Sequence, residues 1–255
     1  MPSLRRILWT CACGFPLAPL GAASADGHRV DSVATNAAGV VFIRVAAGEF
    51  MMGSAPEEPG RHDDETRHAV RLTRDFWIGA REITQRQWSQ VMGGGNPSKI
   101  KGPDLPVTDV AWADAARFCA RLSQSDGRKY RLPTEAEWER ACRAGADSPY
   151  CGPIDEVGWH AGNSGEVAHA VGGKRANGWG LHDMHGNAME WCSDWYQERL
   201  GRAMAVDPVG PEKGEARVAR GGSFRHHPRA ARAAARQAIT PSYQYSHVGF
   251  RVVME

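Results

Sequence analysis

The chain has 255 residues, of which 24% are charged and 42% are apolar, so it is neither a disordered nor a fibrous protein. Its formal net charge is only +2, from 31 basic and 29 acidic residues, which excludes the strongly basic surface of a general nucleic-acid binder. Nine tryptophans and 29 glycines indicate large rigid packing units and many tight turns.

Residues 1–25 have the pattern of a secretory signal peptide. Arg5 and Arg6 precede a short apolar run, and Ala23-Ser24-Ala25 is a small-residue cleavage pattern. The run is too short and too interrupted by proline to span a bilayer, and no later stretch is apolar enough. We therefore expect an exported chain, periplasmic or secreted, with no transmembrane segment in its formally neutral mature form. The alternative is an uncleaved anchor.

Residues 26–40 are small and polar, and we expect them to form a loose lead-in to one domain over residues 41–255. Four short β-type runs follow, at residues 41–45, 49–52, 69–72 and 76–78. Between the second and the third lies an acidic segment, residues 55–65, which we expect to be a solvated loop.

Three helices are predicted from capping residues and apolar periodicity. Thr84 with Gln87 and Thr134 with Glu137 form capping boxes, so one helix is expected from each threonine. The middle helix is expected over residues 112–122, where apolar side chains recur with a 3.6-residue period. Beyond the third helix the helical signals nearly vanish. Long irregular segments need disulfides, a metal ion or buried tryptophans to hold them.

Eight short motifs follow one another along the chain. They are GEFMMGS at 48–54, REIT at 81–84, NPS at 96–98, LPV at 105–107, YRLPTEAEWE at 130–139, GNAMEW at 186–191, RGGS at 220–223 and GFR at 249–251. On these motifs the chain resembles the formylglycine-generating enzyme, or sulfatase-modifying factor, superfamily over about residues 41–253. The resemblance implies an α+β fold, a single domain of the C-type-lectin-like kind with little regular secondary structure.

The resemblance also implies a structural calcium ion. Its ligands would be the side chains of Asp183 and Glu190 and the backbone carbonyls of Gly186 and Ala188. Two carboxylates seven residues apart around a Gly-Asn turn suit the oxygen ligands that calcium prefers. Some members hold a second calcium starting at the position of Asn163, but the loop that follows here is short and nearly without acids, which favours a turn cap.

The founding enzyme of the superfamily oxidises a sulfatase cysteine with O₂ and a copper ion held by two cysteines. The corresponding loop here, residues 224–232, contains no cysteine, and His226 stands at the first position. Ser223 and His227 match family active-site positions, so Ser223, His226 and His227 are the candidate catalytic residues. His247 replaces an asparagine that usually lines the cleft. Formylglycine generation by the copper–cysteine mechanism is therefore not expected.

Four cysteines remain in the expected mature chain: Cys119, Cys142, Cys151 and Cys192. An even number in an exported chain suggests up to two disulfides with three connectivities, and free buried thiols are the alternative. In some exported relatives the positions of Cys119 and Cys142 pair with C-terminal cysteines that are absent here. We therefore expect Cys119 to pair with Cys142, and Cys151 with Cys192.

Six arginines occur within twenty residues: Arg217, Arg220, Arg225, Arg229, Arg232 and Arg236. Guanidinium groups bind carboxylates and phosphates, so arginines bordering the cleft would favour an anionic or peptide ligand. The alternative is that they pair with the acidic segments of the chain itself.

Two functions remain open. One is an oxidoreductase-type factor that modifies or matures a protein or peptide in the periplasm, with an unidentified redox metal that imidazole ligands such as His226 or His227 would suit. Pyoverdine-maturation proteins, which are exported, lack the cysteine pair and are linked to oxidation of a peptide siderophore, are its precedent. The other is a non-catalytic, calcium-stabilised binding module for a protein, peptide or anionic ligand.

Overall fold

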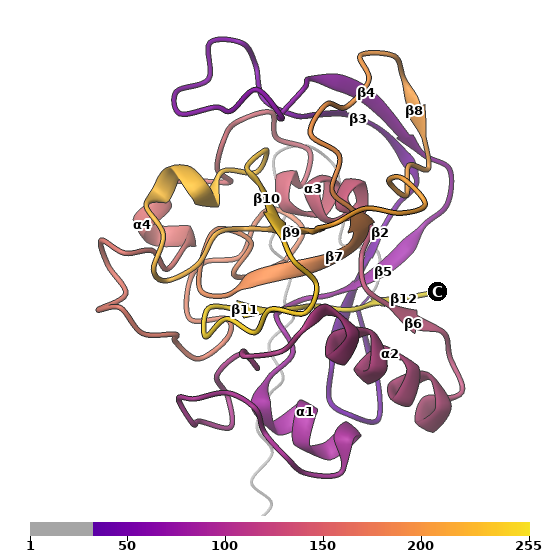
Figure 1. The fold of residues 1–255 in the computed structure, drawn as a ribbon, viewed down its shortest axis with the longest axis vertical. Helices are drawn as coiled ribbons and strands as arrows, with labels where there is room; N and C mark the ends of the chain where they lie inside the picture. The colour runs from indigo at the N-terminus through magenta and orange to yellow at the C-terminus, as the bar shows by residue number, and fades with distance from the viewer. Residues whose placement is uncertain (1–32) are drawn as a thin grey trace, which may run out of the picture.

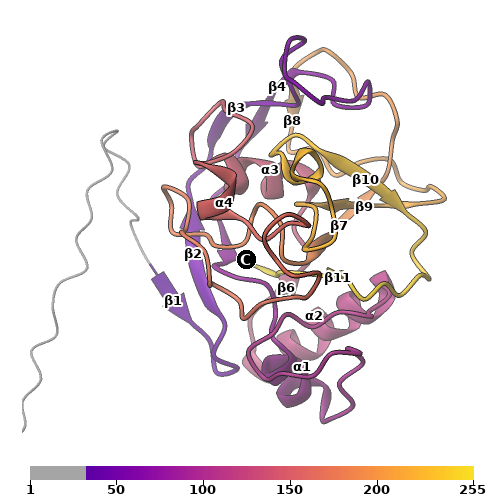
Figure 2. The same cartoon turned by 90° about the vertical axis from the view of Figure 1, so that its left-hand side faces the viewer.

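The structure, a computed structural model, describes residues 33–255 (Figure 1). The predicted signal peptide, residues 1–25, lies outside these residues. Among the residues that the structure describes, no helix has both the length and the apolar composition needed to cross a bilayer. Figures 1 and 2 place α1 and α2 at one end of the molecule and β3, β4 and β8 at the other, with β7 and β9 between them.

The first sheet joins the beginning and the end of the described chain. Its strands, in order, are β1 (Val33–Thr35), β2 (Val41–Val45), β5 (Phe76–Gly79), β12 (Val253–Met254) and β6 (Tyr130–Arg131). Residues 33–40 are therefore not a loose lead-in, because β1 pairs with β2 and the Asn36 side chain accepts the N–H groups of Ala38 and Val40 in the connecting turn.

The remaining strands form two smaller sheets. One contains β3 (Gly48–Met52), β4 (His68–Leu72) and β8 (Ala205–Val206). The other has the order β10 (Arg236–Ile239), β9 (Arg217–Arg220), β7 (Met189–Trp195) and β11 (Val248–Gly249). The strands predicted in the first third of the chain correspond to β2, β3, β4 and β5.

The predicted helices are present as α1 (Gln85–Met92), α2 (Trp112–Asp126) and α3 (Glu135–Arg143), with α4 (Ile154–Val157) and a 3₁₀ turn, η1 (Pro228–Ala231), added later. Both capping boxes form, and Thr84 and Thr134 each accept the N–H three residues on at 3.2 Å. The middle helix continues past its predicted end and stops where Gly127 adopts a left-handed conformation.

The core has two clusters. In the first, the rings of Trp88, Phe118 and Phe250 pack on one another at 5.3–6.2 Å. The second surrounds Trp138 of α3, whose side chain is completely buried. Buried tryptophans therefore hold the irregular second half of the chain, as the composition suggested.

The four described cysteines are free thiols, so the predicted Cys119–Cys142 and Cys151–Cys192 disulfides are absent. Cys119 packs in the first core cluster, whereas Cys142 and Cys192 pack in the second. Cys151 lies only half-buried, and its backbone N–H donates to His185 Nε2 at 3.1 Å. The predicted Cys151–Cys192 disulfide does not form, because Cys192 is completely buried in β7 whereas Cys151 lies half-buried beside His185.

This arrangement predicts the thiol content of the mature protein. Purified without reductant, unfolded in guanidinium and titrated with Ellman's reagent, each chain is expected to give four thiols. In the native state Cys151 should react first, because the other three are buried. Zero or two thiols in the unfolded chain would contradict the structure.

Candidate functional site

The loop after β9 brings two of the three candidate catalytic residues together. Ser223 is completely buried, and its Oγ lies 2.7 Å from His226 Nδ1. The turn is closed by the His226 N–H, which donates to the Ser223 carbonyl at 3.0 Å. Since the Ser223 hydroxyl occupies Nδ1, Nε2 is the free nitrogen of this imidazole.

His227 does not join this pair. It is exposed and precedes η1, where its Nδ1 accepts the N–H of Arg229 at 3.3 Å. Adjacent residues diverge here because His227 is the N-cap of η1, which begins at Pro228. The role of His227 in the described geometry is therefore that of an N-cap.

The neighbour of His226 is His247, from the segment before β11. The two rings meet edge to face with centroids 5.1 Å apart, and Tyr245 lies 5.3 Å beyond His247. Burial, followed by the charges of His226 and Arg225, lowers the pKa of His247 to about 4. Burial also lowers the pKa of His226. Two neutral imidazoles therefore face each other at neutral pH.

A copper–thiolate centre of the family type does not fit this site. The structure places no cysteine in residues 224–232, and its four cysteines lie in the core or beside His185. Burial also raises the pKa of the Cys119 thiol to about 12 and that of Cys142 well above its ordinary value, which opposes the thiolate form that copper binds.

Most of the clustered arginines are structural. Arg236 forms a bidentate pair with Glu135 at 2.6 and 2.9 Å, and Arg220 pairs with Glu139. Arg232 binds Glu58 and Glu65, so part of the acidic segment expected to be solvated is buried on an arginine. Two members remain exposed, Arg225 and Arg229.

The predicted calcium loop is tightly wound. Asp183 and Asn187 have φ of 59°, in the left-handed region. At Gly186 a Cβ atom would lie 2.0 Å from the carbonyl oxygen of Trp159, so only glycine fits there. Of the flanking histidines, His182 Nδ1 contacts the Lys174 carbonyl and His185 Nδ1 that of Ala231, both at 2.8 Å. Each of these two imidazoles therefore has one ring nitrogen bound to a backbone carbonyl outside the predicted calcium-ligand set.

Three buried carboxylates gather around this loop. Glu190 is paired with Arg251 at 2.6 and 2.7 Å, which leaves Glu82 and Asp183 without a cation of their own. Burial, with the charges of Asp183 and Glu190, raises the pKa of Glu82 well above its ordinary value. Burial likewise raises the pKa of Asp183.

The carboxylate Oδ1 of Asp183 is a buried acceptor without a hydrogen-bond donor. Its Oδ2 accepts the Gly172 N–H at 2.5 Å. Within residues 33–255 no three His, Cys, Asp or Glu side chains form a ready metal-ligand group. A calcium ion would therefore need the backbone carbonyls as well as Asp183 and Glu190, and an unpaired carboxylate oxygen beside excess negative charge fits that ion.

Glu82 was not among the predicted site residues. Its Oε1 accepts the Ala188 N–H at 3.0 Å, which ties the start of α1 to the calcium loop more than 100 residues away. The signal that would have found it is a carboxylate inside the REIT motif. Asn163, in contrast, caps a turn as predicted, since its Oδ1 accepts the His160 N–H at 2.9 Å.

Comparison with known proteins assigns the family. Residues 30–255 match the sulfatase-modifying factor enzyme 1-like domain. The chain belongs to this family. It is 28% identical to the formylglycine-generating enzyme of Bos taurus over 96% of this chain and 85% of that protein. It is 33% identical to the formylglycine-generating enzyme of Streptomyces coelicolor over 89% of this chain and 71% of that protein.

Two solved structures of sulfatase-modifying-factor-like fold are also similar. Treponema denticola variable protein 1 superposes with a TM-score of 0.79 at 29% identity, over 89% of this chain and 99% of that one. PvdO from Pseudomonas aeruginosa superposes with a TM-score of 0.82 at 26% identity, over 90% of this chain and 100% of that one. The predicted α+β single-domain fold is confirmed.

Proposed function

We propose that this sulfatase-modifying factor homologue is an exported, periplasmic or secreted protein that oxidatively modifies or matures a protein or peptide. The observation that supports this proposal is the Ser223–His226–His247 group, in which His226 stands at the position of the first copper-binding cysteine and faces the imidazole of His247. Export rests on the sequence pattern of residues 1–25.

The two imidazoles suit a transition metal better than proton transfer near pH 7. A general base works best when its pKa lies near the working pH, whereas the pKa of His247 is about 4. Neutral imidazole is a good ligand for copper and iron. The ligands would be His226 Nε2 and the ring of His247, and a bound redox metal would supply the electron transfer that this chain's side chains lack.

We expect elemental mass spectrometry of the mature protein to find copper or iron in near-stoichiometric amount. His226→Ala and His247→Ala should each lose it, because each removes one of the two ligands. His227→Ala is the matched control and should keep the metal, since His227 caps η1. Retention of the metal in both His226→Ala and His247→Ala would overturn the assignment.

The second candidate is a calcium-stabilised binding module. Tyr245, 37% exposed, lies beside His247, and Tyr243, 53% exposed, packs against Tyr245. The charge of exposed Arg225 contributes to lowering the pKa of His247. Aromatic and arginine side chains are common anchors for protein or peptide ligands. Calcium as the only stoichiometric metal in the same measurement would favour this function.

A further inference from the structure

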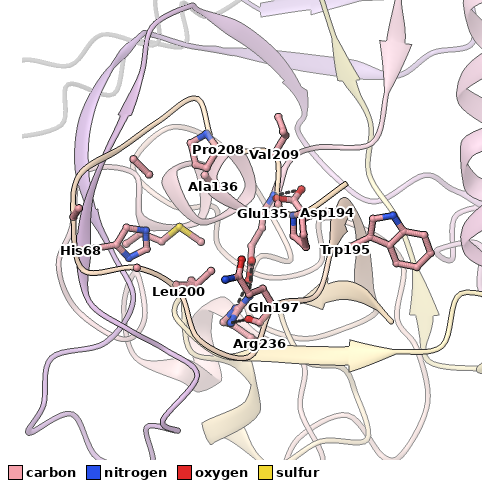
Figure 3. Close-up of a pocket in the computed structure, with 16 residues that line it drawn as sticks. His68, Glu135, Ala136, Asp194, Trp195, Gln197, Leu200, Pro208, Val209 and Arg236 are labelled. Atoms are coloured by element: carbon pink, nitrogen blue, oxygen red, sulfur yellow. Dashed lines mark hydrogen bonds and ion pairs between the residues drawn. The ribbon is translucent and has the colours of Figure 1, made fainter. Parts of the chain in front are cut away.

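A cavity of about 300 Å³ shares no lining residue with the Ser223–His226–His247 group. It is a half-open pocket, lined by the start of α3, the end of β7, strands β3 and β4, and a loop over residues 197–211. Apolar side chains such as Leu200, Val209 and Pro208 line much of it (Figure 3). A dry cavity of about 150 Å³ is enough to bind benzene, so this one can hold a small ring with a polar substituent.

One wall of the cavity carries Glu135 and Asp194 (Figure 3). Glu135 is compensated by its bidentate pair with Arg236. The Nη1 group of Arg236 donates to the carbonyl oxygens of Asp64 and Gln197, both at 2.9 Å. Four of the five guanidinium N–H donors of Arg236 are therefore occupied, which leaves an anionic ligand at most one N–H of this residue.

Asp194 has no such partner. It is 4% exposed, and its Oδ2 accepts the Glu135 N–H at 2.9 Å and the Ser193 hydroxyl at 3.0 Å. No donor among the described residues reaches its Oδ1 within hydrogen-bond distance. Burial and the charge of Glu135 raise the pKa of Asp194 to about 7. At higher pH this wall presents a buried carboxylate with no ion pair of its own, although the Arg217 guanidinium, which donates to the Ser193 carbonyl, lies near enough to interact with its charge.

The cavity offers further acceptors. His68 is buried, and its Nδ1 lies 2.8 Å from the Thr66 carbonyl, so this nitrogen carries the donated proton and Nε2 has no partner among the described residues. The Gln197 Nε2 group donates to the Arg199 carbonyl at 2.9 Å, which leaves its oxygen as an acceptor. The free acceptors of the cavity are therefore Asp194 Oδ1, His68 Nε2 and the Gln197 side-chain oxygen, beside one unused N–H each of Gln197 and Arg236.

We propose that this cavity is a binding site for a small organic ammonium ion, with the ammonium group on Asp194 and the apolar body against Leu200 and Val209. A cation supplies both the charge and the N–H donors that Asp194 Oδ1 lacks. A neutral ligand of the same shape would leave the ionised carboxylate unpaired, which is unfavourable in a buried position.

The test uses benzylamine as the probe and isothermal titration calorimetry on the mature protein at pH 8. We expect saturable binding of the benzylammonium ion, and at least tenfold weaker binding of benzyl alcohol, its neutral isostere. Asp194→Asn should weaken benzylammonium binding at least tenfold, and Leu200→Trp, which fills the cavity, should abolish it. Asp104→Asn, at an exposed carboxylate outside the cavity, is the matched control and should bind as the parent protein does.

The pH dependence gives a second readout. Binding should weaken at least tenfold between pH 8 and pH 5, because Asp194 takes up a proton in that range. Other titratable or charged groups surround Asp194. They face it from neighbouring elements or line the same cavity, and they are His68, Glu135, Glu137, Cys192, Arg217 and Arg236. Asp194→Asn should lose most of this dependence.

Misfolding of the variant is checked independently. Folding raises the pKa of the Asp194 carboxyl, so its ionisation at pH 8 lowers the stability of the folded parent protein. The amide side chain of the Asp194→Asn variant cannot ionise, so this variant should melt no lower than the parent protein at pH 8. Equal binding of the alcohol and the ammonium ion, or unchanged affinity in a folded Asp194→Asn, would overturn the proposal. Absence of saturable benzylammonium binding to the parent protein would do so as well.

Discussion

Replacing Arg232 with methionine is expected to lower the free energy of unfolding by about 3–5 kcal/mol at pH 7, the range observed when one partner of a buried ion pair is removed. Arg232 is 1% exposed and donates to Glu65 at 2.6 and 2.8 Å and to Glu58 at 2.7 Å. Methionine keeps much of the side chain's volume but leaves Glu65, which is completely buried, without its counter-ion. Urea unfolding followed by tryptophan fluorescence measures the difference.

The matched control is Arg229→Met, three residues earlier on the same loop. Arg229 is exposed and only its backbone carbonyl contacts Arg232, so this variant should change stability by less than about 0.5 kcal/mol. A similar loss in both variants would show that the loop, and not the buried pair, sets the effect.

The pH dependence of Arg232→Met follows from Glu65. Burial raises the pKa of this carboxyl, but the hydrogen bond and charge of Arg232 outweigh burial and hold its pKa below 4.5. A lowered folded-state pKa gives stability that is present above pH 4.5 and is lost as pH falls. The deficit of the variant should therefore be largest at neutral pH and shrink on acidification below about pH 4.5.

The local features of the fold were predictable because they depend on neighbouring residues. Thr84 with Gln87 and Thr134 with Glu137 are capping pairs within one helical turn, so their effect is visible in a short stretch of sequence. The family motifs additionally predict the overall fold, since they identify the arrangement of segments that no local sequence pattern connects.

The contacts that close the molecule were not predictable, because they join residues far apart in the chain. The Arg232–Glu65 pair spans 167 positions and the Arg236–Glu135 pair spans 101. Any of the acidic residues had the right charge, and only the path of the backbone selects among them. The same reason explains why His247, and not the adjacent His227, is the neighbour of His226.

Calcium is expected to raise the stability of the protein by about 2.7 kcal/mol when its free concentration is 100 times its dissociation constant. The physical reason is the charge imbalance around the calcium loop, where Arg251 compensates Glu190 but Glu82 and Asp183 have no cation. Thermal unfolding at pH 8 in excess calcium and in excess EGTA measures this difference. Asp183→Ala should abolish it, and Asp63→Ala, at a fully exposed carboxylate, should keep it.

The sign of the pH dependence separates calcium binding at this cluster from a general salt effect. Without metal, the raised pKa values of Glu82 and Asp183 mean that the folded state binds more protons than the unfolded state. The stability of the EGTA-treated protein should therefore fall as pH rises above about 4–5, where these groups ionise when unfolded. Calcium binds the ionised carboxylates, so its stabilising effect should be larger at pH 8 than at pH 5. An equal effect at both pH values, or one that persists in Asp183→Ala, would place the ion elsewhere, because only an ion bound at this carboxylate cluster competes with the protons of Asp183 and its neighbour Glu82.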